Sequence, residues 1–166
     1  MTGILKCDTI QNTGGTFEHA RLVQVVNTTN VSMTTGTTAI PHDDTIPQND
    51  EGDQIMTCAI TPTHASNKLL IEVIVQFCTA SNVACCCALF QDSTAGALAC
   101  SADYGSNREQ SSMRLQHYMT TGTTSSTTFK VRFGATSGTT TINGDNGART
   151  YGGVCTTGIT ISEIRV

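Results

Sequence analysis

The sequence is poor in residues on which several classes of protein depend. It has no tryptophan, three prolines and 5% aromatic residues, and only 13% of its residues are charged, about half the share usual in soluble domains. No apolar run reaches the roughly 18 residues that a membrane-spanning helix needs. The net charge is −4 and the basic residues are scattered, whereas nucleic-acid binding needs a clustered basic surface. We therefore predict no nucleic-acid partner and no membrane insertion.

Motifs of catalysis and of cofactor binding are also missing. The four histidines do not stand at metal-ligand spacing from one another or from a cysteine pair, and no Cys-x-x-Cys occurs. No Gly-x-Ser-x-Gly nucleophile motif and no glycine-rich phosphate loop opening a helix is present. We therefore predict a protein that is not an enzyme, with no catalytic residues, no cofactor and no metal.

One acidic stretch, residues 42–53, offers weak candidates for a cation. Its carboxylates belong to Asp43, Asp44, Asp50, Glu51 and Asp53. Calcium takes six to eight oxygen ligands from a flexible loop, but this spacing is not that of an EF-hand. Aspartate and asparagine are also common turn residues, so a solvated acidic loop is the favoured interpretation.

Threonine, by contrast, is abundant, at about one residue in six. It is β-branched, suits a half-exposed strand and is a poor helix former. Two-residue alternation recurs at 21–27, 53–61, 68–77, 83–91, 111–120, 127–135, 139–143 and 158–166, with polar glycine-containing turns between. We therefore expect an all-β fold, an antiparallel β-sandwich of jelly-roll type with about eight strands.

Two of these strands predict which faces are buried. In 68–77, one face holds only apolar residues and should be core, namely Leu69, Ile71, Val73, Val75 and Phe77. In 83–91, both alternating rows are apolar. Such a strand is covered on both sides, by a second sheet or by a neighbouring subunit, and we take it as a first indication of an oligomer.

The eight cysteines form an even number, which is compatible with a disulfide framework. Such frameworks belong to exported domains, and the N-terminus lacks the pattern of a secretory signal. Six of the cysteines fall in or beside apolar strand-like runs: Cys58, Cys78, Cys85, Cys86, Cys87 and Cys100. We expect reduced thiols that pack as small hydrophobic side chains.

The chain divides into an arm and a head. Residues 1–20 precede the first convincing strand and are predicted to form an N-terminal arm for docking or oligomer contacts, and residues 21–166 a single β-sandwich head. Within the arm, Ile4, Leu5 and Ile10 are candidate contact residues, and Gly14 and Gly15 a candidate hinge. Residues 28–52 should form an extended connection with little regular structure.

Surface loops provide the remaining candidates for ligand binding. Tyr104 lies in residues 101–110, which we interpret as a polar loop between strands, with Asn107 and Arg108 beside it as hydrogen-bonding partners. Tyr151 lies in a second glycine-rich loop. The simpler alternative is an exposed hairpin loop whose tyrosine packs on its own base.

Several segments resemble structural proteins of tailed bacteriophages. Residues 4–15, ILKCDTIQNTGG, resemble the opening phrase of virion proteins from marine and cyanobacterial phages. Residues 39–62, 68–77 and 139–166 are similar to the tail-fibre-type domains of phages and prophages. Together these segments cover 74 of the 166 residues, a little under half of the chain.

The resemblance implies a non-enzymatic virion component made in the host cytoplasm, with β-sandwich heads in a homotrimer. The most direct reading is a tail fibre or receptor-binding head that attaches to a host surface glycan or protein. One alternative is a capsid decoration or head-fibre protein, held by its arm to other virion proteins. A second alternative is a free carbohydrate-binding β-sandwich module.

Overall fold

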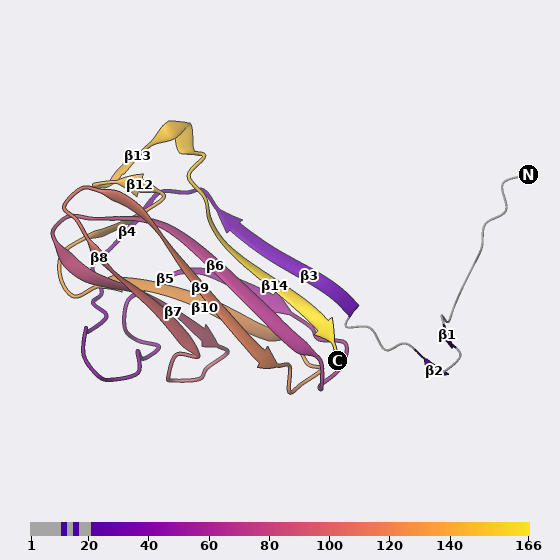
Figure 1. Ribbon diagram of the computed structural model, residues 1–166. Coiled ribbons are helices and arrows are strands. Elements are labelled where there is room, and N and C mark those ends of the chain that lie inside the picture. The colour runs from indigo at the N-terminus through magenta and orange to yellow at the C-terminus, as the bar shows by residue number, and fades with distance from the viewer. Residues whose placement is uncertain (1–10, 13–14, 17–20) are drawn as a thin grey trace, which may run out of the picture.

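Two antiparallel β-sheets pack face to face in the computed structural model, which describes residues 11–12, 15–16 and 21–166 (Figure 1). The four-stranded sheet has the order β5 (Asp53–Ile60), β10 (Thr127–Ala135), β7 (Val83–Gln91) and β8 (Ala99–Gly105). The six-stranded sheet contains β3 (Arg21–Asn30), β14 (Thr157–Arg165), β6 (Lys68–Thr79), β9 (Gln110–Thr120), β11 (Thr140–Ile142) and β4 (Thr34–Gly36). The predicted all-β sandwich is confirmed.

Strand β6 is the centre of the six-stranded sheet. Strand β9 pairs with one edge of β6, and β14 and β11 pair in turn with its other edge. Strands β3 and β4 lie outside β14 and β11. Apart from the consecutive pair β7 and β8, strands adjacent in space are distant in sequence in both of these sheets, and the topology is that of a jelly roll.

The remaining elements are short. Strands β1 (Gln11–Asn12) and β2 (Gly15–Thr16) pair with each other, β12 (Gly144–Asp145) pairs with β13 (Ala148–Arg149), and one 3₁₀ turn spans Tyr151–Gly153. In the described part of the chain, no helix has the length and hydropathy needed to cross a membrane. Of the predicted arm residues, Gly15 begins β2, whereas Ile4, Leu5, Ile10 and Gly14 lie outside the described residues.

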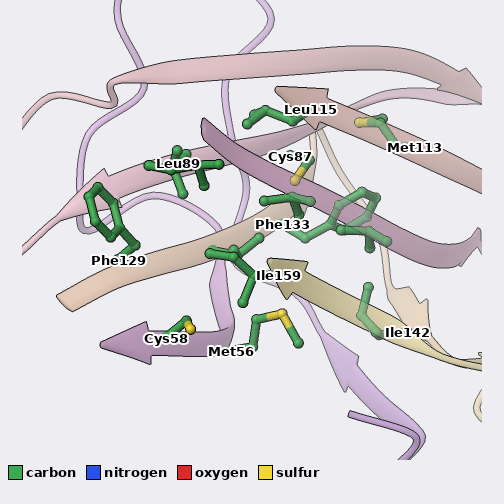
Figure 2. Close-up of a cluster of buried hydrophobic side chains, with 14 of the residues drawn as sticks. Met56, Cys58, Cys87, Leu89, Met113, Leu115, Phe129, Phe133, Ile142 and Ile159 are labelled. Atoms are coloured by element: carbon green, nitrogen blue, oxygen red, sulfur yellow. The ribbon is translucent and has the colours of Figure 1, made fainter. Parts of the chain in front are cut away.

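The hydrophobic core lies between the two sheets, as Figure 2 shows. The predicted core face of β6 is confirmed, since Leu69, Ile71, Val73, Val75 and Phe77 are all buried. The rings of Phe77 and Phe133 bring the two sheets together, with centroids 4.9 Å apart and planes inclined by 41°.

One prediction about the strands is wrong. Residues 101–110 were expected to form a loop, but Ala99–Gly105 form strand β8 at an edge of the four-stranded sheet. The turn that follows is confined to residues 106–109. The strand was missed because the inward residues of β8 are small or polar, so its sequence shows no alternation of hydrophobicity.

The outer row of β7 is buried by the chain itself. Ala88 and Phe90 point away from the core between the sheets, yet they are 0% and 1% exposed. Residues 37–52, here called the cover segment, run along this outer face. Near the start of β7, Ile40 N of the segment donates to Ala135 O on β10 at 3.3 Å. Beyond the end of β7, Ala97 N donates to Pro47 O of the segment at 2.9 Å.

An arginine and a glycine fix the cover segment to the sheet. Arg132 on β10 donates from Nε to Glu51 O and from Nη2 to Gly52 O, both at 2.6 Å. At Gly134, an added β-carbon would lie 2.8 Å from Ile40 Cγ1 and from the carbonyl oxygen of Thr38. The doubly apolar strand therefore has the core on one side and this segment on the other.

The cysteines are free thiols in the described part of the chain. Four of them are buried, namely Cys58, Cys78, Cys85 and Cys87, whereas Cys86 and Cys155 are half-buried and Cys100 is exposed. Burial raises the pKa of the Cys85 thiol to about 11 and that of the Cys86 thiol to about 12. The prediction of small hydrophobic side chains holds for the buried four.

Glu163 is a buried carboxylate at the end of the sandwich where the chain terminates. It is 0% exposed, and it accepts hydrogen bonds from Gln24 Nε2 and Asn67 Nδ2 at 2.6 Å each and from Thr63 N and Oγ1 at 2.9 Å each. Burial raises its pKa, but these donors outweigh burial and lower the pKa to about 2. Glu163 therefore ties the β5–β6 connection to β14 and β3.

Candidate binding surface at the loop end

The candidate ligand-binding residues gather at one end of the sandwich, here called the loop end and defined by residues 80–82, 104–110 and 143–156. Figure 1 shows β12 and β13 at this end and the C-terminus at the opposite end. Strand β3 also enters the sandwich opposite the loop end, since Arg21 pairs with Arg165. The predicted site residues Tyr104, Asn107, Arg108 and Tyr151 all belong to the loop end.

Tyr104 is held by its hydroxyl group and remains accessible. It is 67% exposed on β8, and its Oη donates to Asn82 O at 3.2 Å. Asn107 N donates to Asn82 Oδ1 at 2.7 Å. The turn between β6 and β7 therefore supports both residues, and the Tyr104 ring stays exposed.

The β8–β9 turn lies directly against the end of β6. Arg108 N donates to Thr79 O at 3.0 Å, and Arg108 has a left-handed backbone with φ of 60°. At Gly105, an added β-carbon would lie 2.3 Å from Thr79 Oγ1. Only glycine permits this approach, which positions the exposed Arg108 side chain at the rim of the sandwich.

Residues 143–156 form the second half of the loop end. Asn143 is buried, and its side chain donates to Asn30 O at 2.8 Å and accepts from Thr157 Oγ1 at 2.9 Å. Cys78 Sγ donates to Asp145 Oδ1 at 3.3 Å, and burial raises the pKa of the Cys78 thiol. The β12–β13 hairpin is therefore fixed to the sandwich at its base.

Tyr151 stands on a strained turn. It has φ of 45° and is 75% exposed, and Gly152 and Gly153 after it also have positive φ. Non-glycine residues rarely adopt this backbone, and such strain gathers at functional sites. A direct link joins this turn to the other half of the loop end, because Gln110 Nε2 donates to Thr150 Oγ1 at 2.8 Å.

Arg149 is a loop-end residue that sequence reasoning missed. It is exposed at the end of β13, and an added β-carbon at Gly153 would lie 2.8 Å from its Cδ. The glycine therefore makes room for this side chain over the 3₁₀ turn. The Gly152-Gly153 pair was the available signal, because consecutive glycines mark a place where the chain or a side chain approaches closely.

The acidic candidates do not form a cation site in the described residues, where no three His, Cys, Asp or Glu side chains come together in a way that holds a metal. They instead bind their own segment. Asp43 accepts from Thr45 Oγ1 and N, Asp53 from Thr38, and Glu51 from Gln48 N. Asp44 and Asp50 are exposed. The loop-end tyrosines and arginines therefore remain the better candidate site.

Comparison with known proteins places the chain in no family. No protein-family model and no curated protein matches it. Among solved structures, it is similar to Eiger TNF from S. frugiperda, with 10% identity, a TM-score of 0.48 and coverage of 87% of this chain and 94% of that one.

Two further solved structures are larger than this chain. The infectious bursal disease virus VP2 subviral particle matches at 15% identity and a TM-score of 0.43, over 100% of this chain and 42% of the viral chain. Latent PorU from Porphyromonas gingivalis matches at 9% identity and a TM-score of 0.44, over 95% of this chain and 14% of the PorU chain. All three TM-scores lie below 0.5, so these likenesses assign neither a family nor a function.

Proposed function

We propose that the protein is a non-enzymatic structural component of a bacteriophage virion, a homotrimeric tail-fibre head whose loop end binds a host surface glycan or protein. The observation that carries the proposal is the gathering of Tyr104, Arg108, Arg149 and Tyr151 on one rigid end. The chain enters and leaves the sandwich at the other end. A particle attached through the N-terminal arm would therefore leave the loop end pointing outward.

The chemistry of the loop end suits such a ligand. Exposed tyrosine rings stack on sugar rings or on apolar groups of a protein, and exposed arginines donate several hydrogen bonds in a fixed geometry. The Tyr104 side chain is anchored by its hydrogen bond to Asn82 O in the β6–β7 turn, which lowers the entropy that binding costs. Asn107 beside Tyr104 adds a neutral amide that donates and accepts.

A competition experiment tests this function. The purified protein should reduce phage adsorption to host cells, and Tyr104→Ala, Arg108→Ala and Tyr151→Ala should each weaken competition about tenfold or more. Arg165→Ala at the opposite end and Ile46→Ala on the cover segment are the controls and should compete like wild type. Wild-type protein that never competes would refute host recognition.

Immunogold labelling of particles locates the protein independently of binding. Label at fibre ends supports the tail-fibre assignment. Label over capsids, together with protection of capsids against heat, would replace it by a decoration protein. Particles without label would refute the virion proposal and leave a free carbohydrate-binding module as the better assignment.

A further inference from the structure

The outer face of strands β3, β14, β6 and β9 is exposed and has an ordered pattern. The register sets its side chains in rows across the four strands. One row joins Val25, Ser162, Leu70 and Tyr118, and the next joins Asn27, Thr160, Glu72 and Gln116. The first of these rows is mainly apolar and the second is polar.

Exposed apolar side chains concentrate near the C-terminal end of β14. Leu22, Val25 and Tyr118 are 59%, 50% and 55% exposed, and the half-buried Leu70 and Ile164 lie between them across the strands. Several exposed apolar residues on one face mark an interaction surface, whereas single ones do not. Covering these residues would remove their apolar surface from water.

Asn27 and Lys68 of this face make hydrogen bonds within it. Asn27 Nδ2 donates to Ile159 O at 3.0 Å and to Thr160 Oγ1 at 2.9 Å. Lys68 Nζ donates to Thr120 Oγ1 at 2.6 Å on the neighbouring strand. Burying a polar group that keeps its hydrogen bonds costs far less than burying an unpaired one, so Asn27 does not oppose the covering of this face.

Two exposed charged residues of opposite sign lie on neighbouring strands of this face. Glu72 lies opposite Gln116 and Arg114 opposite Ile74, so the two stand diagonally on β6 and β9. Both line a shallow groove of about 710 Å³ whose floor includes Gly158. Both side chains are exposed, and neither takes part in the hydrogen bonds described above for this face. A face on which Glu72 and Arg114 lie on neighbouring strands can place each of these charges against the opposite charge of a second copy.

We infer that this face is the contact surface between copies of the chain. Each copy places its apolar band against its neighbour, and Glu72 of one copy pairs with Arg114 of the next. The cover segment already occupies the outer face of the other sheet, which leaves this face for the neighbour. The inference deepens the proposed homotrimer, but it concerns a surface other than the loop end and is tested separately.

The first test measures the mass of the full-length protein in solution by light scattering coupled to gel filtration. Wild type should have three chain masses. Val25→Asp and Tyr118→Asp should shift the mass to one chain while the circular dichroism spectrum stays unchanged, since both residues are at least half exposed. Ile46→Asp and Val154→Asp, at residues that are 62% and 74% exposed elsewhere, are matched controls and should keep the wild-type mass.

A charge exchange tests the pairing itself without touching apolar residues. Glu72→Arg and Arg114→Glu should each raise the dissociation constant of the oligomer about tenfold or more, because like charges then meet. The double variant should restore association. A monomeric wild type, face variants that keep the wild-type mass, or control variants that lose it equally would overturn the interface. Unchanged adsorption of loop-end variants would instead refute only host recognition.

Discussion

The outer faces of the two sheets differ in what covers them. On the four-stranded sheet, Ala88 and Phe90 are buried beneath the cover segment. On the six-stranded sheet, Leu70 and Ile74 occupy the equivalent outer row of β6 but alternate with Glu72 and Gln76. A wholly apolar outer row is thus covered within the chain, whereas a mixed row is left free for a partner.

The cover segment is polar in sequence, although it covers an apolar row of the sheet. The cover segment contains four carboxylates, and most of its side chains are exposed. Its covering side is made by Ile40, by backbone and by Gly52, whose carbonyl oxygen binds Arg132. The segment buries apolar residues of the sheet with little apolar surface of its own.

We expect the largest loss of stability from truncation of Phe90, on the covered outer face. Phe90→Ala should lower the free energy of unfolding by about 3–5 kcal/mol, as for a core phenylalanine, whereas Leu70→Ala on the other outer face should cost about 1 kcal/mol or less. Urea unfolding of both, in the Val25→Asp background so that contacts between copies do not contribute, measures the difference. Equal losses would mean that the two outer faces do not differ in packing.

The second prediction concerns Glu163, which ties the six-stranded sheet from inside. Glu163→Gln should lower the free energy of unfolding by about 2–3 kcal/mol, because the carboxylate is lost and a new amide donor faces Gln24 and Asn67. Thermal unfolding at pH 7 measures this loss, and Glu109→Gln, at an exposed turn, is the matched control.

Acid should reproduce part of this loss in the wild type. The folded pKa of Glu163 is about 2, below its ordinary value of 4.5, so the folded state binds fewer protons and the stabilisation is complete above that ordinary value. It should disappear as the pH falls from about 5 to 2. The Glu163→Gln variant should lack this part of the pH dependence, and parallel pH profiles of the two proteins would contradict the assignment.

Local alternation predicted much of the fold. The strands at 53–61, 83–91 and 127–135 and the core face of β6 follow from two-residue periodicity alone. Strand β8 was missed because an edge strand with small inward residues has no such signal. The cover segment could not be predicted, since its partners Ala135 and Ala97 lie far along the chain.

The candidate site was predictable only in part. Tyr104 and Tyr151 attract attention in a sequence without tryptophan, but nothing local shows that they share one end of the sandwich. That arrangement depends on the jelly-roll topology and on the hydrogen bond from Gln110 to Thr150. Glu72 and Arg114 were equally hidden, because the register of β6 against β9 makes them neighbours.

The two faces of β7 can also be compared with each other, through the reactivity of their cysteines. Cys85 points into the core and Cys86 toward the cover segment, so a thiol reagent distinguishes opening of the core from opening of the cover. In the native protein, Cys100 should react first because it is exposed, Cys86 slowly, and Cys85 only upon unfolding.

Arg132→Ala should change this order at one residue. The variant loses both hydrogen bonds to the cover segment, and a loss of about 1.4 kcal/mol in local stability would raise the labelling rate of Cys86 about tenfold. The rate of Cys85 should stay unchanged, because the core between the sheets does not depend on that arginine. Mass spectrometry of alkylated peptides measures both rates in one sample. Equal acceleration at both thiols would show that the cover segment and the core open together, and the outer row of β7 would then belong to one cooperative unit with the core.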